Sequence, residues 1–178
     1  MRKPCKRSWP NKDERKRRLS PRLLVALILV STQLMGADGI PDFVQYQVKR
    51  VFKGAPAPVE LGSHPNARRF RTMLREGAER GENFAGQYTI ITWGCGTACQ
   101  EISIVDASTG AVHFPPNLRL NAYHMVTDGS DPFRFRIDSR LLVVTGSPND
   151  TNETGIFYYT WDGRKLKRIG AVRKTWPR

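Results

Sequence analysis

Short apolar or alternating runs, separated by turn residues, recur along the chain from residue 43 onward. Runs of this length and pattern are typical of β-strands. They predict strands at 43–52, 88–93, 102–106, 111–114, 140–145, 156–161 and 165–172. Because the run 140–145 is mostly apolar, it is expected to be buried on both faces. Asp162-Gly163, between the last two runs, predicts a hairpin.

One segment has helical periodicity instead. Its apolar side chains recur every three or four positions, and arginines and glutamates fill the other positions. The apolar members are Ala67, Phe70, Met73, Leu74 and Ala78. Ser63 or His64 can cap this helix, and Gly81 is placed to end it. The whole pattern predicts an α+β fold, in which an antiparallel sheet or meander of about six to eight strands carries one amphipathic helix at about 65–80.

Two stretches lack a strand pattern. Residues 117–135 contain the turn pairs Asp128-Gly129 and Asp131-Pro132, and residues 147–154 are polar. Both stretches are therefore expected to be irregular loops.

The charge of the chain is concentrated at its start. The 178 residues, 39% of them hydrophobic, suit one globular domain, and the formal net charge is +13. Residues 1–22 hold ten of the 29 Lys and Arg, so residues 23–178 keep an excess of only five positive charges. This distribution argues against nucleic acid as a partner.

An apolar run directly follows the basic start. A basic region, an apolar core at 23–35 and small residues after it are typical of a secretory signal peptide. We expect residues 1–38 to be this signal and residues 40–178 to be a single β-rich domain in the periplasm or outside the cell. In the alternative, the segment stays uncleaved and anchors the protein, and it would then be the only membrane contact. The short apolar core disfavours this alternative, because a full span needs roughly 20 apolar residues.

The cysteine count supports export. Cys5 lies within the predicted signal, which leaves the pair Cys95 and Cys99 in the mature chain. An even count in an oxidising compartment predicts a disulfide. If residues 96–98 form a three-residue hairpin loop, Cys95 faces Cys99, and opposed residues have numbers that sum to 194. Redox chemistry and metal binding by the pair are the alternatives, and the β context and the lack of a second cysteine pair disfavour them.

These segments resemble a known type of protein. The motif Asn83-Phe-Ala-Gly-x-Tyr88, followed by Trp93-Gly-Cys-Gly-x-x-Cys99, is similar to a family of small exported bacterial proteins without an assigned activity. The resemblance covers about residues 60–170. It implies an exported domain and brings no catalytic residues with it.

The sequence contains no complete catalytic motif. A Gly-x-Ser-x-Gly elbow, a His-Glu-x-x-His pair and a glycine-rich phosphate loop are all missing. We therefore expect a non-catalytic binding or structural module of the cell envelope, with no cofactor and no metal. Trp93, Tyr158 and Trp161 are the candidate ligand surface, and the expected partner is an envelope protein, a peptide or a glycan.

The alternative function is an envelope enzyme. It would be a hydrolase that uses Asp and His side chains of the 106–138 region, or a thiol–disulfide oxidoreductase that uses Cys95 and Cys99. The candidates in the first case are His113 or His124, the acids Asp106, Asp128, Asp131 and Asp138, and Ser130 or Ser139 as nucleophile.

Overall fold

The computed structural model describes residues 39–124, 126 and 129–174. From Ile40 onward the chain is one compact unit. The predicted signal peptide at 1–38 lies outside the described residues. Within the described part, no helix is long and apolar enough to cross a membrane.

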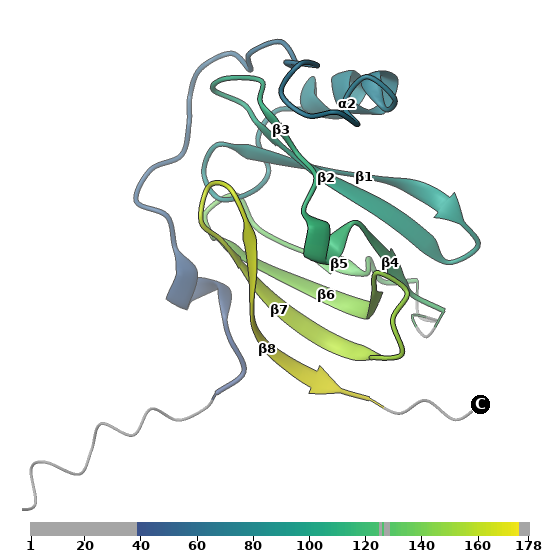
Figure 1. Ribbon diagram of the computed structural model, residues 1–178. Coiled ribbons are helices and arrows are strands. Elements are labelled where there is room, and N and C mark those ends of the chain that lie inside the picture. Colours follow the sequence, from purple (N-terminus) through teal and green to yellow (C-terminus); the bar gives the residue numbers. More distant parts are fainter. Residues whose placement is uncertain (1–38, 125, 127–128, 175–178) are drawn as a thin grey trace, which may run out of the picture. The chain divides into compact units, whose positions relative to one another are not determined.

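Eight antiparallel strands form the body of this unit (Figure 1). The strands are β1 (Tyr88–Gly96), β2 (Cys99–Asp106), β3 (Val112–His113), β4 (Leu120–Ala122), β5 (Phe133–Arg134), β6 (Leu141–Pro148), β7 (Gly155–Trp161) and β8 (Leu166–Arg173). The order β1-β2-β4-β6-β7-β8 forms the main path, with β3 beside β2 and β5 beside β6. Together with α2 (Arg71–Ala78), the one α-helix of the described residues, this sheet confirms the predicted α+β fold.

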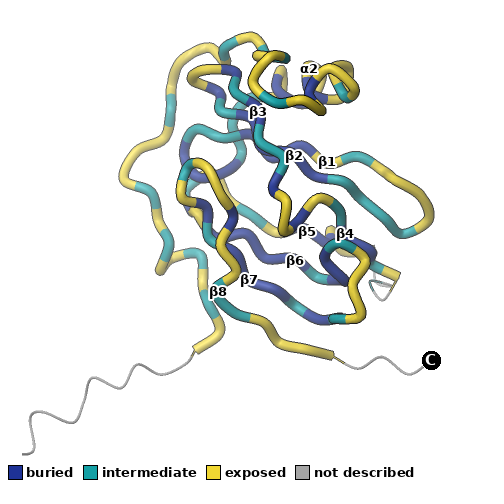
Figure 2. Tube along the Cα trace, in the orientation of Figure 1, coloured by how far each residue is buried: buried dark blue, intermediate teal, exposed yellow. Residues whose placement is uncertain are grey.

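The central core lies between the two halves of the sheet. Alternate residues of β1 and β2 face alternate residues of β6, β7 and β8, and the largest side chains between them are fully buried (Figure 2). Phe84, Ile102, Leu142, Phe157 and Trp161 are members of this core. Burial of this kind is the main favourable contribution to folding.

Each outer face of the sheet has its own cover. Leu74 and Ala78 of α2 pack on Ile91 and Val105 of the β1–β2 half. On the other half, Leu141, Val143 and Tyr158 form a smaller cluster. Because Leu142 and Val144 point into the central core, β6 is buried on both faces, as its apolar run predicted.

A segment that we call the strap, residues 47–60, runs along one side of the sheet. It connects residues 43–46, which cover the smaller cluster, to the turns that precede α2. Its backbone donates hydrogen bonds from Val48 to Asp138 O (2.9 Å), from Ala57 to Ala107 O (2.7 Å) and from Glu60 to Gly110 O (2.8 Å). The prediction of a strand at 43–52 is therefore wrong. A 3-10 helix, η1 (Phe43–Tyr46), begins there, with Asp42 and Gln45 forming a capping box.

The spacing of aromatic residues explains η1. Phe43 and Tyr46 are three residues apart, so one helical turn places both rings on the smaller cluster formed by Leu141, Val143 and Tyr158. Val44 between them is 61% exposed. The alternation of Val44, Tyr46 and Val48 predicted a strand. The spacing between Phe43 and Tyr46, which fits a helical turn, was not considered.

The helix is shorter than predicted. Residues 61–70 form turns, and α2 begins only at Arg71, without a side-chain cap. Ser63 does not cap it, because the Ser63 hydroxyl donates to Glu60 O and accepts from the Val112 backbone N–H. The predicted end is close to correct, since the helix stops at Ala78 and Gly81 has a φ of +82°.

The stretch 117–135 is not fully irregular. A short 3-10 helix, η2 (Pro116–Leu118), precedes β4, and β5 lies near the end of the stretch. β4 joins the two halves of the sheet by pairing with β2 through Glu101–Leu120 and with β6 through Ala122–Ser147. The predicted loop at 147–154 is also two residues shorter, because Ser147 and Pro148 belong to β6.

Candidate functional site

The three aromatic residues predicted as a ligand surface do not come together. Trp161 is 1% exposed in the central core, where its ring lies between Tyr88 (centroid distance 5.4 Å) and His113 (5.3 Å). Tyr158 is 4% exposed and packs in the cluster covered by η1. The assignment of these two side chains to an exposed surface is therefore wrong, because neighbouring residues of β7 point into two different cores.

Trp93 is half-buried at the edge of the core beneath α2. Its ring lies 4.9 Å from Phe70 and 6.3 Å from Phe114, and its indole N–H donates to Glu101 Oε2 at 2.9 Å. Both its polar atom and its ring thus have partners within the protein. Trp93 completes the packing between α2 and the sheet.

Cys95 and Cys99 lie at the exposed end of the β1–β2 hairpin. Their sulfur atoms are at disulfide distance, and their Cα atoms are 5.2 Å apart. The predicted register is correct over most of the hairpin, with Ile90 opposite Ile104 and Trp93 opposite Glu101.

The loop of this hairpin differs from the prediction. Gly96 pairs with Cys99, so the loop is Thr97–Ala98, and Cys95 occupies a bulge rather than a paired position. Gly96 and Ala98 have positive φ values of +144° and +49°. The bulge keeps the two sulfur atoms together although the loop has one residue fewer than predicted.

Three of the hydrolase candidates, Asp106, Ser139 and His113, make contacts that stabilise the fold. The candidate Asp128 lies outside the described residues. Asp106 accepts hydrogen bonds from Gln87 Nε2 (3.1 Å), the Ser108 backbone (2.8 Å) and the Ser108 hydroxyl (2.6 Å). Ser139 is fully buried, and its hydroxyl donates to Phe43 O. Burial lowers the pKa of His113, whereas the nearby Asp106 raises it and His64 lowers it further. His113 therefore tends to stay neutral and packed on Trp161.

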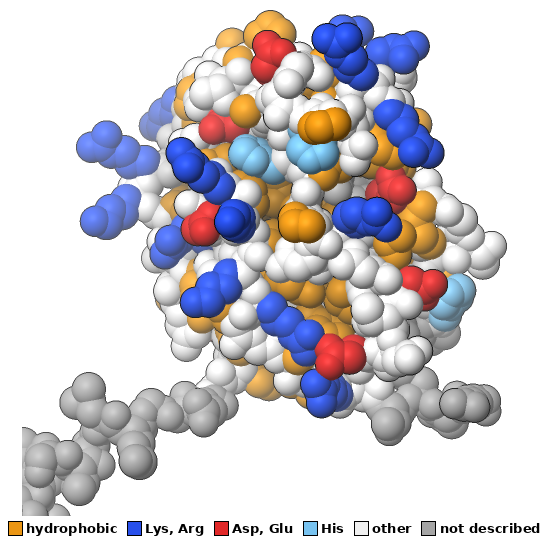
Figure 3. All heavy atoms as spheres, in the orientation of Figure 1, with side chains coloured by type: hydrophobic (Ala, Val, Ile, Leu, Met, Phe, Trp, Pro, Cys, Tyr) orange, Lys and Arg blue, Asp and Glu red, His pale blue; other side chains and the backbone are white. Residues whose placement is uncertain are grey.

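A different part of the molecule forms a pocket with an apolar floor. We call it the Tyr159 pocket, and its volume is about 260 Å³. Its lining residues come from η2, from the end of β6 and the loop after it, and from β7 and β8; they are Asn117, Pro148, Asn149, Thr151, Glu153, Phe157, Tyr159 and Arg168. In the space-filling view, hydrophobic side chains lie at the bottom of a hollow in the lower half of the face, with basic and acidic side chains at its rim (Figure 3).

The hydroxyl of Tyr159 is the central polar group of this pocket. The residue is 2% exposed, and its side chain lines the pocket between Phe157 and Arg168. Burial raises the pKa of Tyr159, so it keeps its proton and can donate as well as accept.

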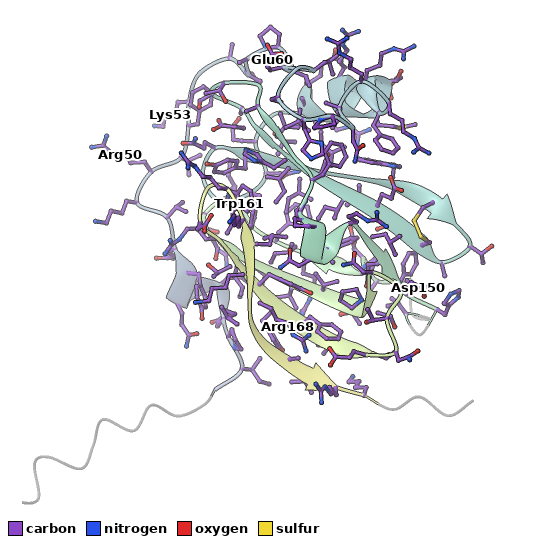
Figure 4. All side chains as sticks on the ribbon, in the orientation of Figure 1. Arg50, Lys53, Glu60, Asp150, Trp161 and Arg168 are labelled. Carbon is purple, nitrogen blue, oxygen red and sulfur yellow. A yellow bond between two sulfur atoms is a disulfide. The ribbon has the colours of Figure 1, made fainter. Side chains whose placement is uncertain are left out.

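The rim carries an ion-pair network. Glu153 accepts from Arg168 Nη1 at 2.8 Å and from Arg173 Nη2 at 2.7 Å, and these hydrogen bonds lower the pKa of Glu153. The Arg168 guanidinium also lies 4.7 Å from the centre of the Phe157 ring. Figure 4 shows Arg168 over the lower part of the sheet, away from Trp161.

Asparagine side chains hold the walls of the pocket in place. Asn117 Nδ2 donates to Leu166 O at 2.8 Å and thereby ties η2 to the edge strand β8. Asn149 accepts from the Arg119 backbone (2.8 Å) and donates to Pro116 O (3.1 Å). Asn149 and Asp150 both have a positive φ, which Asn and Asp tolerate better than other side chains. The walls of the pocket are thus held by hydrogen bonds that do not involve the Tyr159 hydroxyl.

The sequence analysis missed this pocket. Its residues come from four separate stretches, of which one was predicted as part of an irregular segment and another as a polar loop. The available signal was the Asn149-Asp150 pair in a polar loop between two strongly apolar strands, which indicates a specific turn. Comparison with protein-family models, with curated proteins and with solved structures finds no match for this chain.

Proposed function

We propose that this protein is an exported, non-catalytic binding module of the cell envelope, which holds a small ligand or the end of a larger one in the Tyr159 pocket. The observation that carries the proposal is the pocket of about 260 Å³, which is lined by apolar side chains and by Tyr159, whose pKa is raised by burial. A concave site with an apolar floor and a few polar groups is the usual form of a ligand site.

The lining chemistry favours binding over catalysis. The pocket offers a phenol, two amides, a threonine hydroxyl and an ion pair, all of which can orient a bound group. A nucleophile with an adjacent general base is the arrangement that covalent catalysis needs, and these lining residues do not supply it.

Export is the second part of the proposal. It is supported by the basic and apolar start of the sequence and by the Cys95–Cys99 pair at disulfide distance. A disulfide persists in an oxidising compartment and is rare in the cytosol. The resemblance to small exported bacterial proteins agrees with this part of the proposal.

The binding proposal is tested by a protein-observed NMR screen of the isotope-labelled protein against aromatic fragments, amino-acid derivatives and monosaccharides. We expect compounds that bind to shift the backbone signals of Asn149, Thr151 and Arg168. Tyr159→Phe removes only the hydroxyl and should weaken binding about 5- to 100-fold, because a buried hydrogen bond to the ligand is lost.

Tyr158→Phe is the matched control, because it makes the same change at the neighbouring residue, which faces away from the pocket. This variant should bind as the wild type does. The proposal is contradicted if compounds bind elsewhere on the surface, if none binds, or if both variants lose binding equally.

A further inference from the structure

The ion pairs at the rim of the Tyr159 pocket leave one positive charge in excess. Glu153 is shared by two arginines, with one carboxylate oxygen on Arg168 and the other on Arg173. In the described part of the chain, the Arg168 guanidinium donates only through Nη1, although it carries five N–H donors. The rim is therefore able to accept a second carboxylate.

Glu153 itself shows where such a carboxylate can bind. It belongs to the loop between β6 and β7, and its side chain reaches the guanidinium of a residue on β8. Both partners are about two-fifths exposed, so the ion pair faces water and is weak. A carboxylate from a ligand can replace it at small cost.

The surface that lines the pocket beside Arg168 is mostly apolar and can contact a ring or a large apolar group. Phe157 is fully buried beneath the guanidinium, and the Tyr159 and Pro148 side chains line the pocket beside it. Guanidinium and aromatic faces of this kind bind planar groups well. The volume of about 260 Å³ is below the range of about 300–1,000 Å³ that drug-sized ligands occupy, which favours a group the size of one amino acid.

We propose that the Tyr159 pocket binds a group that carries a carboxylate next to an aromatic or large apolar side chain, as in the last residue of a peptide or in a small organic acid. The carboxylate replaces Glu153 on Arg168, the apolar part lies on the Pro148 and Tyr159 side chains that line the pocket beside it, and the Tyr159 hydroxyl binds a polar atom of the ligand. This inference rests on the proposed function and adds the chemical class of the ligand.

The test compares N-acetyl-L-phenylalanine with its amide, which differs only in lacking the charge, by isothermal titration calorimetry on the full chain. We expect the acid to bind about tenfold more tightly, because hydrogen bonds between charged groups are stronger than neutral ones. Arg168→Gln should remove this difference. Lys167→Gln makes the same charge change on the next residue, outside the pocket lining, and should preserve it.

Glu153→Gln gives a result that a merely structural ion pair would not give. Because the variant removes the internal competitor for Arg168, the acid should bind several-fold more tightly than to the wild type, and the amide should bind as before. Circular dichroism of each variant checks that the fold is intact.

The outcomes separate the two proposals. If the acid and the amide bind equally well and Tyr159→Phe weakens both, the ligand class is wrong and the pocket remains a binding site. If neither compound binds, the ligand class is wrong whatever the fragment screen shows. Preference for N-acetylglucosamine that is insensitive to Arg168→Gln would also overturn it.

A peptide arm identifies the source of the carboxylate. Acetyl-Ala-Ala-Phe with a free carboxyl end is compared with N-acetyl-L-phenylalanine under the same conditions. Tighter binding of the peptide indicates a polypeptide end, and equal binding indicates a free acid. Both results support the carboxylate class, whereas equal binding of the peptide and its amidated form contradicts it.

Discussion

Gly110 is the residue at which the strap crosses the turn between β2 and β3. Its N–H donates to Asp106 O (2.7 Å) and its carbonyl accepts from the Glu60 N–H (2.8 Å). Its φ is +77°, and a Cβ atom built on it would collide with the carbonyl of Pro58. Only glycine satisfies both the backbone angle and the close approach.

Gly110→Ala is therefore expected to destabilise the protein by about 2–4 kcal/mol, as the sum of backbone strain and overpacking. Gly81→Ala is the matched control, because Gly81 also has a positive φ but no atom lies within 4 Å of the added Cβ. It should cost only about 1 kcal/mol. Urea unfolding of both variants gives the comparison, and equal costs would show that the strap does not depend on this crossing.

At the scale of elements, the sequence predicted what depends on neighbours along the chain. The hairpins β1–β2 and β7–β8 were predicted with their partners, because a local turn and period-2 alternation determine both. β4 was missed because its three residues are ordered by pairing with β2 and β6, which no local pattern reveals. η1 was missed because its two aromatic rings pack on Leu141, Val143 and Tyr158, which are about 100 residues away in the sequence.

The tip of the β1–β2 hairpin provides a prediction for one element. Cys95 and Cys99 close a loop of only five residues, so replacing both by alanine should cost no more than about 2 kcal/mol. Hydrogen exchange should rise at residues 94–100 and stay unchanged in β6, β7 and β8. Faster exchange across the whole sheet would mean that the cysteine pair supports the global fold rather than the tip.

At the scale of the whole molecule, the distribution of functional groups was the least predictable feature. The sequence favoured a single β-rich domain, and the described residues form one unit with three apolar clusters. The aromatic side chains chosen as a ligand surface turned out to fill those clusters, because a strand between two covers buries both of its faces. The Tyr159 pocket exists only where η2, a loop and two strands meet.

A crystal structure of the full chain grown with a compound from the binding screen tests the central claim most directly. The account predicts the compound in the Tyr159 pocket beside Arg168, with one of its polar atoms within hydrogen-bond distance of Tyr159 Oη. It is contradicted if the compound sits elsewhere, or if the pocket is closed and the Tyr159 hydroxyl is paired with another atom of the protein.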